Sequence, residues 1–120
     1  MTDAEAPPLI DLDYLFDLFE DAEGVAEIVQ VLSESALARM EELVDGLGRG
    51  DAEASRRAAH AMKGSARSAG AAPFAAVCEL IEHSCAAGSL DEAAAVLEDA
   101  RDLLRRTLAY GADATAGGST

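Results

Sequence analysis

The sequence predicts an all-α protein: an up-down-up-down antiparallel four-helix bundle with a short additional N-terminal helix covering one end. Three observations carry this prediction. Apolar residues between positions 9 and 110 recur at intervals of three and four rather than two. The breaks in this pattern fall at glycine-rich positions. The long periodic segments are joined by only a few residues, and links this short make neighbouring helices antiparallel.

The first two helices are predicted from their apolar stripes. A short helix is expected over residues 11–20, where Leu12, Leu15, Phe16 and Phe19 share one face. The second begins after Asp21, whose side chain suits an N-cap. Its stripe keeps the helical spacing for more than six turns, until glycines at positions 46, 48 and 50 end it. That stripe consists of Val25, Ile28, Val29, Leu32, Ala36, Met40, Leu43 and Leu47.

The third and fourth helices are placed by their end signals. The third is expected from its N-cap Asp51 to Ala69, with Gly70 as the C-terminal stop. The fourth starts around Pro73, which a first helical turn tolerates, and runs to Gly88. Its apolar positions are Phe74, Val77, Leu80, Ile81 and Cys85.

The fifth helix is predicted from Ser89 to about Tyr110. Ser89 and Glu92 have the spacing of a capping box. Residues 9–110 are therefore expected to form the domain. The Pro pair in residues 1–8 and the small, polar composition of residues 111–120 predict a disordered N-terminus and a flexible C-terminal tail.

The net charge and the hydropathy of the chain argue against nucleic acids and membranes as binding partners. The chain has 23 acidic residues against nine Lys or Arg, a formal net charge of -14, which opposes binding to a polyanion. No apolar run approaches the roughly 20 residues of a membrane span, and residues 1–8 lack the features of a signal peptide. We therefore expect a cytoplasmic monomer that binds neither nucleic acid nor membrane.

The two cysteines predict packing rather than a disulfide or a metal site. Cys78 and Cys85 share one helix face about two turns apart, beyond disulfide reach. A metal site that combines them with His60 and His83 is disfavoured, because His83 and Cys85 are two residues apart and cannot share a face. The cysteines also point toward the expected core, so no metal is expected.

One basic stretch stands out in the acidic chain. Residues 54–78 contain no Asp or Glu but several of the Lys and Arg residues. At about 100° per residue, Arg56, Lys63 and Arg67 lie on one stripe of the third helix, and His60 lies on the same stripe. The opposite face must turn to the core, which predicts that His60 faces solvent. That apolar face consists of Ala58, Ala59, Met62, Ala66 and Ala69.

The placement of His60 suggests a chemical role. A lone histidine or a basic helix face is usually without function. Here, however, the imidazole is flanked by cations, which disfavour its protonated form and leave a neutral nitrogen as a nucleophile. The same cations would stabilise an attached anion, and phosphate is the obvious candidate. Gly64 costs about 1 kcal/mol inside a helix, so we expect that it gives another protein access to His60 or permits a close helix crossing.

These residues resemble the motif of the histidine-containing phosphotransfer (HPt) domain, His-x-x-Lys-Gly-x. The similarity in layout extends over about residues 9–108. Met62 and Ala66 depart from the commoner residues of the family, but neither departure removes a group that the chemistry requires. The motif matches at His60, Lys63, Gly64, Ser65 and Gly70.

The resemblance implies a phosphorelay intermediate. His60 would accept a phosphoryl group from the aspartyl phosphate of one receiver domain and pass it to an Asp of another, with Lys63 stabilising the group. The partners would be response-regulator receiver domains and a hybrid or separate histidine kinase. The chain itself would carry no cofactor, because Mg²⁺ is expected on the receiver. No P-loop or kinase signature occurs, so no autonomous ATP-dependent kinase activity is expected.

The resemblance also suggests which residues surround the site. Candidates for the phosphoryl or partner environment are Arg56, Gly64, Ser65 and Arg67. Candidates for partner docking are Leu12, Leu15, Phe16 and Arg57, although covering the end of the bundle explains the three apolar residues equally well.

Two other functions are weighed against this one. The first is a non-phosphorylated helical-bundle adaptor that binds a receiver or a kinase, which the loss of the motif His or Lys would favour; neither is lost. The second is a bundle enzyme with paired carboxylates. The acidic residues are scattered over outer helix faces without a Glu-x-x-His metal signature, so they indicate a solvated surface.

Overall fold

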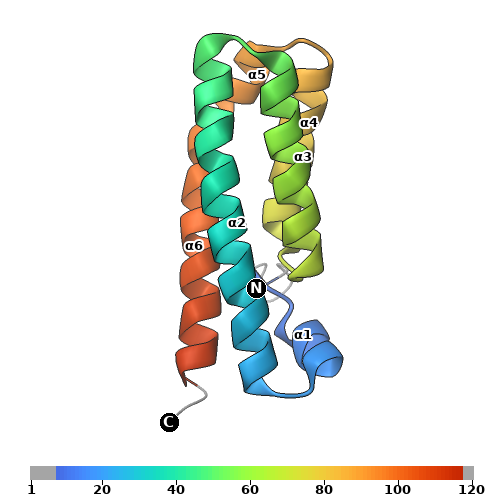
Figure 1. The fold of residues 1–120 in the computed structure, drawn as a ribbon, viewed down its shortest axis with the longest axis vertical. Coiled ribbons are helices and arrows are strands. Elements are labelled where there is room, and N and C mark those ends of the chain that lie inside the picture. Colours follow the sequence, from blue (N-terminus) through green and yellow to red (C-terminus); the bar gives the residue numbers. More distant parts are fainter. Residues whose placement is uncertain (1–7, 118–120) are drawn as a thin grey trace, which may run out of the picture.

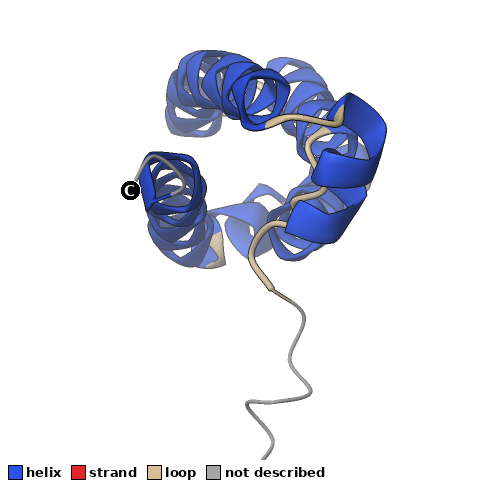
Figure 2. Cartoon of the chain, turned by 90° about the horizontal axis from the view of Figure 1, so that it is seen from below, coloured by secondary structure: helices blue, strands red, loops and turns tan. Residues whose placement is uncertain are grey.

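The computed structural model describes residues 8–117, which form helices joined by short loops, with no strand in this range. Helices α2, α3, α4 and α6 form an antiparallel bundle, with α1 at one end and α5 across the other (Figure 1). Seen along its length, the bundle closes around a common core (Figure 2). This confirms the predicted architecture. The helices are α1 (Leu12–Phe19), α2 (Ala22–Arg49), α3 (Ala52–Ser68), α4 (Ala72–Ala86), α5 (Leu90–Ala95) and α6 (Leu97–Gly117).

Aspartates fix the start of the first three helices. Asp11, Asp21 and Asp51 each accept a hydrogen bond from the backbone N–H three residues later, at distances of 2.7–3.1 Å. Each bond satisfies one of the N–H groups that a helix leaves free at its start. The predicted caps Asp21 and Asp51 are confirmed, and α3 is thereby held in the register that places His60 on its surface.

The end of α2 lies later than expected. The helix continues through Gly46 and Gly48 to Arg49, and only Gly50, with a φ of 74°, ends it in the left-handed region. Gly46 is buried, and a Cβ built on it would lie 2.6 Å from Ser55 Oγ of α3. This glycine therefore permits the close approach of α2 and α3 rather than stopping the helix.

Replacement of Gly46 by Ala is expected to lower the free energy of unfolding by about 1–3 kcal/mol, because the added methyl group overlaps Ser55. Gly48→Ala provides a matched control two residues away. A Cβ at that position has no neighbour within 4 Å, so this change should stabilise the protein by up to about 1 kcal/mol through helix propensity. Urea denaturation of both variants measures the difference; equal stabilities would contradict the close contact.

The last predicted helix is divided in two. Val96 interrupts it with φ −102° and ψ 3°, and its N–H bonds to carbonyls near the end of α5. The short α5 therefore lies across the end of the bundle, while α6 returns along α2 (Figure 1). The predicted capping box is also wrong, because the Ser89 side chain makes no capping hydrogen bond.

The C-terminal part of the chain is more ordered than its composition predicts. The helix expected to end near Tyr110 continues as α6 to Gly117. Gly111 is buried, and a Cβ there would lie 2.9 Å from Val29 and 3.0 Å from Ile10. Tertiary packing against α2 thus offsets the low helix propensity of the glycine. The remaining parts of the predicted terminal segments, residues 1–7 and 118–120, lie outside the described residues.

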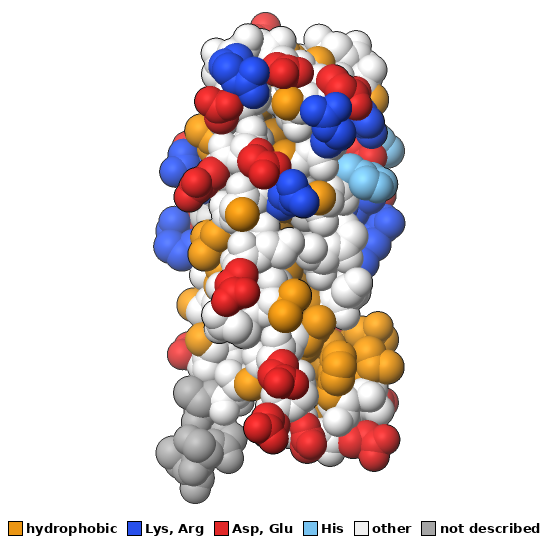
Figure 3. Space-filling model, in the orientation of Figure 1, with side chains coloured by type: hydrophobic (Ala, Val, Ile, Leu, Met, Phe, Trp, Pro, Cys, Tyr) orange, Lys and Arg blue, Asp and Glu red, His pale blue; other side chains and the backbone are white. Residues whose placement is uncertain are grey.

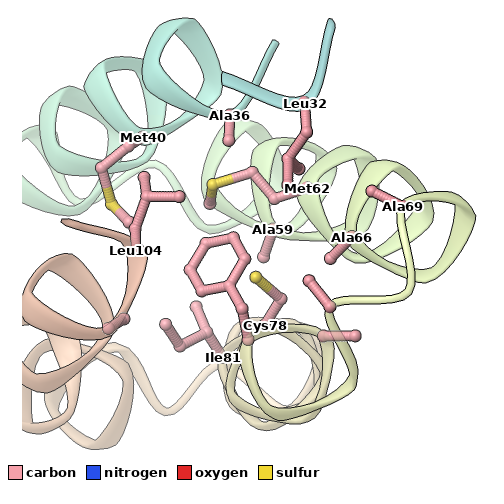
Figure 4. Packing of buried hydrophobic residues seen from close by; sticks show 14 of the residues in the cluster. Leu32, Ala36, Met40, Ala59, Met62, Ala66, Ala69, Cys78, Ile81 and Leu104 are labelled. Atoms are coloured by element: carbon pink, nitrogen blue, oxygen red, sulfur yellow. The ribbon is translucent and has the colours of Figure 1, made fainter. Parts of the chain in front are cut away.

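Small side chains on α3 bring it close to its neighbours. The predicted apolar face of α3 is buried throughout and packs mainly against α2 and α4. Cys78 of α4 and Met62 of α3 both belong to this core (Figure 4). Both Cys78 and Cys85 are buried free thiols, in agreement with the predicted packing role. Because its inner face is used in packing, α3 presents to solvent an outer face that includes Arg57, His60, Gly64 and Arg67.

Candidate functional site

His60 lies in the middle of α3 with 63% of its side chain exposed. The predicted orientation toward solvent is therefore confirmed. Basic and acidic side chains both lie near the histidine side chains on the right-hand side of the molecule in Figure 3. The imidazole is fixed by the register of a packed helix and is open to a second molecule.

A carboxylate from the neighbouring helix α4 contacts both motif residues. Glu82 Oε2 lies 2.8 Å from His60 Nδ1, and Glu82 Oε1 lies 2.6 Å from Lys63 Nζ. The side chains of Lys63 and Glu82 are each only 13% exposed. His60, Glu82 and Lys63 therefore form one connected cluster, with the histidine at its solvent side.

The surroundings of the imidazole include carboxylates as well as the expected cations. Residues 54–78 lack acidic side chains in sequence, but α4 packs antiparallel to α3 and brings Glu79 and Glu82 beside the stripe. Arg67 pairs with Glu79 at 2.8 Å, and Lys63 lies 3.9 Å from the same carboxylate. The sequence does contain a sign of these carboxylates: Glu79 and Glu82 lie one helical turn apart just after the basic stretch, so both can face the same neighbouring helix.

The contact with Glu82 determines which imidazole nitrogen is available. A carboxylate only accepts hydrogen bonds, so in the neutral ring Nδ1 carries the hydrogen and donates it to Glu82. The lone pair then resides on Nε2. Because Nδ1 is engaged and most of the ring is exposed, Nε2 is the nitrogen that can attack an incoming electrophile.

Glu82 remains a carboxylate in this setting. Burial raises the pKa of its carboxyl, but the contacts with Lys63 and His60 outweigh that effect, and the net pKa lies below the ordinary value. The ionised Glu82 therefore holds Lys63 in place and stabilises positive charge on the imidazole ring. The imidazole ring acquires such positive charge when its Nε2 forms a new bond.

Arg56 and Arg57 share a carboxylate at the start of α3. Arg56 donates to Glu53 from Nε and Nη2 at 3.1 and 2.8 Å, and Arg57 donates to it from Nη1 at 3.3 Å. The hydrogen bonds from Arg56 hold the pKa of Glu53 below its usual value. Arg56, Arg57 and His60 line the same groove.

Ser65 occupies a different environment from the arginines. Its hydroxyl lies 3.1 Å from the hydroxyl of Ser35, which belongs to α2. This polar contact is partly buried and links the two helices. The Ser65 hydroxyl therefore has a hydrogen-bond partner within the bundle. Its expected place near a phosphoryl group stays a prediction.

Gly64 lies at an open position. A Cβ built on it would have no neighbour within 4 Å, so the alternative explanation, a close helix crossing, is wrong. The glycine is exposed and follows Lys63 directly. A flat, side-chain-free surface at this point leaves room for a second protein beside the imidazole.

Gly64→Ala is expected to keep the fold and to raise the free energy of unfolding by up to about 1 kcal/mol. Gly64→Gln should slow phosphoryl transfer from a receiver domain more than it slows labelling by the small donor phosphoramidate, because only the protein must approach closely. The ratio of the two rates is the measurement. A normal ratio for Gly64→Gln would show that the glycine is not needed for access.

The apolar docking candidates on α1 differ in exposure. Leu15 is fully buried, so its assignment to docking is wrong; it fixes α1 to the bundle. Leu12 is half-buried and Phe16 is 40% exposed. A hydrophobic patch extends over α1 on the face that Figure 3 shows. The predicted docking candidates do not include the other exposed apolar side chains of this helix, which are Tyr14, Leu18 and Phe19.

Metal-binding clusters and membrane-spanning helices are both absent from residues 8–117. No group of three or more His, Cys, Asp or Glu side chains in this range could hold a metal ion. None of the helices described there is long and apolar enough to cross a membrane.

Comparisons with known proteins agree with this geometry. The solved structure of histidine-containing phosphotransfer protein B (HptB) from Pseudomonas aeruginosa PAO1 superposes with a TM-score of 0.83 and 26% sequence identity, covering 92% of this chain and 97% of that chain. A search of curated proteins gave no match. The family model described as Hpt domain matches residues 27–110, which include the whole cluster of His60, Lys63 and Glu82. The chain belongs to the Hpt domain family.

Proposed function

We propose that this protein is the histidine phosphotransfer component of a two-component phosphorelay, with His60 as the phosphoacceptor. The observation that carries the proposal is the state of the His60 ring: it is 63% exposed, and its Nδ1 is bound to Glu82. Nε2 is thereby left as an exposed nucleophile on a rigid helix. The family membership supports a function in two-component signalling.

The proposed reaction exchanges one bond to phosphorus for another. Nε2 of His60 attacks the phosphorus of a receiver's aspartyl phosphate, an N–P bond forms, and the P–O bond to the aspartate breaks. The carboxylate leaves with the electron pair and stays on the receiver. Transfer to a second receiver reverses these events with that receiver's Asp as the nucleophile.

The residues around His60 meet the needs of this transfer. Phosphoryl transfer passes through a loose transition state and depends mainly on positioning and charge neutralisation. Glu82 holds Nδ1–H and stabilises the positive charge that develops on the ring when Nε2 attacks. Lys63, whose ammonium lies in the same cluster, would turn toward the phosphoryl oxygens. Mg²⁺ would belong to the receiver, which also supplies the acidic residues that bind it.

We infer that the chain is a phosphocarrier without kinase activity of its own. The supporting observation is the content of the site, in which His60 is accompanied by an ion-paired lysine and carboxylate. In the sequence there is no phosphate-binding P-loop or kinase signature. On this proposal, the phosphoryl group comes from an already phosphorylated partner.

The test uses the receiver domains and histidine kinases of the same cell. Receivers labelled with ³²P at Asp are incubated with the purified protein, and the label is followed over time. We expect label to pass to this chain, to be acid-labile and alkali-stable, and to be absent when ATP replaces the labelled receivers. Binding to a receiver without uptake of label from any of them would contradict phosphotransfer and support the adaptor.

A further inference from the structure

A polar groove lies between the second half of α2 and the first half of α3, with His60 at its border. Its volume is about 460 Å³. Ala54 and Ala61 contribute only small side chains to its wall, which leaves room between the longer ones. The groove is lined by Arg39, Glu42, Asp45, Arg49, Ala54, Arg56, Arg57, His60 and Ala61.

Four arginines from two helices converge on this space. We name the site the arginine groove and define it by Arg39 and Arg49 of α2 and Arg56 and Arg57 of α3. The chain has only nine Lys and Arg residues against 23 acidic ones. Four of the few basic residues of the chain therefore lie around one groove, next to His60.

The present partners of these arginines are exposed carboxylates on the same or the adjoining helix. Arg39 pairs with Glu42 at 3.0 Å, with exposed fractions of 46% and 55%. Arg57 is 64% exposed and shares Glu53 with Arg56. Exposed pairs of this kind contribute little to stability and are easily exchanged.

The arginines also have unused hydrogen-bond donors. A guanidinium group carries five N–H donors in a planar fork that fits a carboxylate. Arg39 and Arg57 each donate a single side-chain hydrogen bond within the described residues. A ligand that offers carboxylate oxygens could therefore be bound without a large rearrangement of the groove.

We propose that the arginine groove binds a carboxylate-bearing surface segment of the receiver domain while phosphate is transferred at His60. This inference rests on the proposed function. His60 is one of the residues that line the groove, so a protein that covers His60 also contacts the border of the groove. Single carboxylates fit better than a densely charged polyanion, since Glu42 and Asp45 also line the groove and the whole chain has a net charge of -14.

The surface that a receiver would cover around His60 has two chemically different ends. Along α3, the groove lies toward the start of the helix, whereas α1 and its hydrophobic patch lie toward the end (Figures 1 and 3). A receiver seated over His60 would contact apolar side chains on one side and guanidinium groups on the other. Charge complementarity at the second end would raise the association rate and select among receivers of similar shape.

The experiment compares two double variants of the full chain. Arg39→Gln/Arg57→Gln removes two groove cations that pair with carboxylates on their own helices. Arg101→Gln/Arg105→Gln on α6 removes two cations with equivalent intrahelical pairs outside the groove. For the groove variant we expect KM for the phosphorylated receiver to rise about tenfold with kcat unchanged and with a weaker dependence on salt. The α6 variant should stay within about twofold of wild type.

A third variant tests the sign of the effect. Glu53→Gln removes the carboxylate shared by Arg56 and Arg57 and should lower KM by about twofold to fivefold, since more donors become free. Circular dichroism verifies the fold of every variant. A KM that changes in the same direction for Glu53→Gln and for Arg39→Gln/Arg57→Gln would overturn the charge-based explanation.

A small donor separates failure of the groove from failure of the proposed function. Labelling of His60 by phosphoramidate is measured on every protein, and receiver rates are expressed relative to it. If wild type is labelled by both donors but the groove variant and the α6 variant have equal KM values, the groove proposal is wrong and phosphotransfer stands. If neither donor labels wild type, the proposed function fails, and the inference that rests on it fails too.

Discussion

His60→Gln is expected to reduce phosphoryl uptake from a labelled receiver to background while the helical bundle stays intact. The side chain is 63% exposed, so its replacement removes little packing. A glutamine amide can still hydrogen-bond to Glu82, but its nitrogen is not a nucleophile toward phosphorus. The measurement is the stoichiometry of label on the purified variant, together with its circular dichroism spectrum and melting temperature.

His83→Gln is the matched control for this variant. His83 is the second histidine of the chain, is exposed and lies on α4. It should accept phosphate as wild type does, and its label should show the same acid lability. Undiminished label on His60→Gln together with lost label on His83→Gln would move the phosphoacceptor to α4 and end the assignment of His60.

The face of α3 could be predicted because helical periodicity is a local property. Burial of Met62 and Ala66 and exposure of His60 both follow from about 100° per residue once the helix exists. Asp51 fixes the start of that helix by bonding to a backbone group three residues away. Such features depend on neighbours within one or two turns, and the sequence displays these directly.

The role of Glu82 could not be predicted in the same way. Its contacts with His60 and Lys63 depend on the rotation and axial offset of α4 against α3, which many contacts of the core determine together. The charge pattern of α3 alone therefore predicts a cationic surface, whereas in the folded protein carboxylates of α4 lie beside the basic residues of α3. The burial of Leu15 could not be predicted for the same reason, because the apolar stripe of α1 does not reveal which of its members points inward.

The helix ends were missed where packing overrides local preference. Gly46 has a low helix propensity but lies inside α2, because only a residue without a side chain fits against Ser55. Gly111 is retained within α6 for the same reason, here against Ile10 and Val29. Glycine thus occurs in three distinct settings in this protein: helix termination at Gly50, close helix packing at Gly46 and Gly111, and an open surface position at Gly64.

Lys63→Ala is the second change with a large expected effect, because Lys63 has two candidate roles. It neutralises Glu82, at 2.6 Å, in a setting where both side chains are 13% exposed. Its loss should lower the free energy of unfolding by about 1–3 kcal/mol by leaving a poorly solvated carboxylate without its partner. It should also slow transfer by roughly tenfold to a hundredfold if its ammonium contacts the phosphoryl group, the loss of one charge-assisted contact of about 1.5–3 kcal/mol.

The pH dependence of stability provides an independent measure of the Glu82 charge. The pKa of the Glu82 carboxyl in the folded protein lies below its ordinary value of 4.5. The ionised group therefore stabilises the fold above that ordinary value, and this contribution is lost as the pH falls through the folded pKa. The difference in stability between wild type and Glu82→Gln should be complete at neutral pH and should disappear in acid.

The double variant Lys63→Ala/Glu82→Gln separates the two roles of the lysine. Glu82→Gln removes the charge that Lys63 neutralises but keeps an oxygen that can accept the His60 Nδ1 hydrogen. In the Lys63→Ala background it should therefore restore most of the lost stability, which gives a coupling energy in a double-mutant cycle. The transfer rate should stay low, because no ammonium is left for the phosphoryl oxygens. Recovery of both stability and rate would instead show that Lys63 acts on phosphotransfer only through Glu82, as a positioning residue for the histidine.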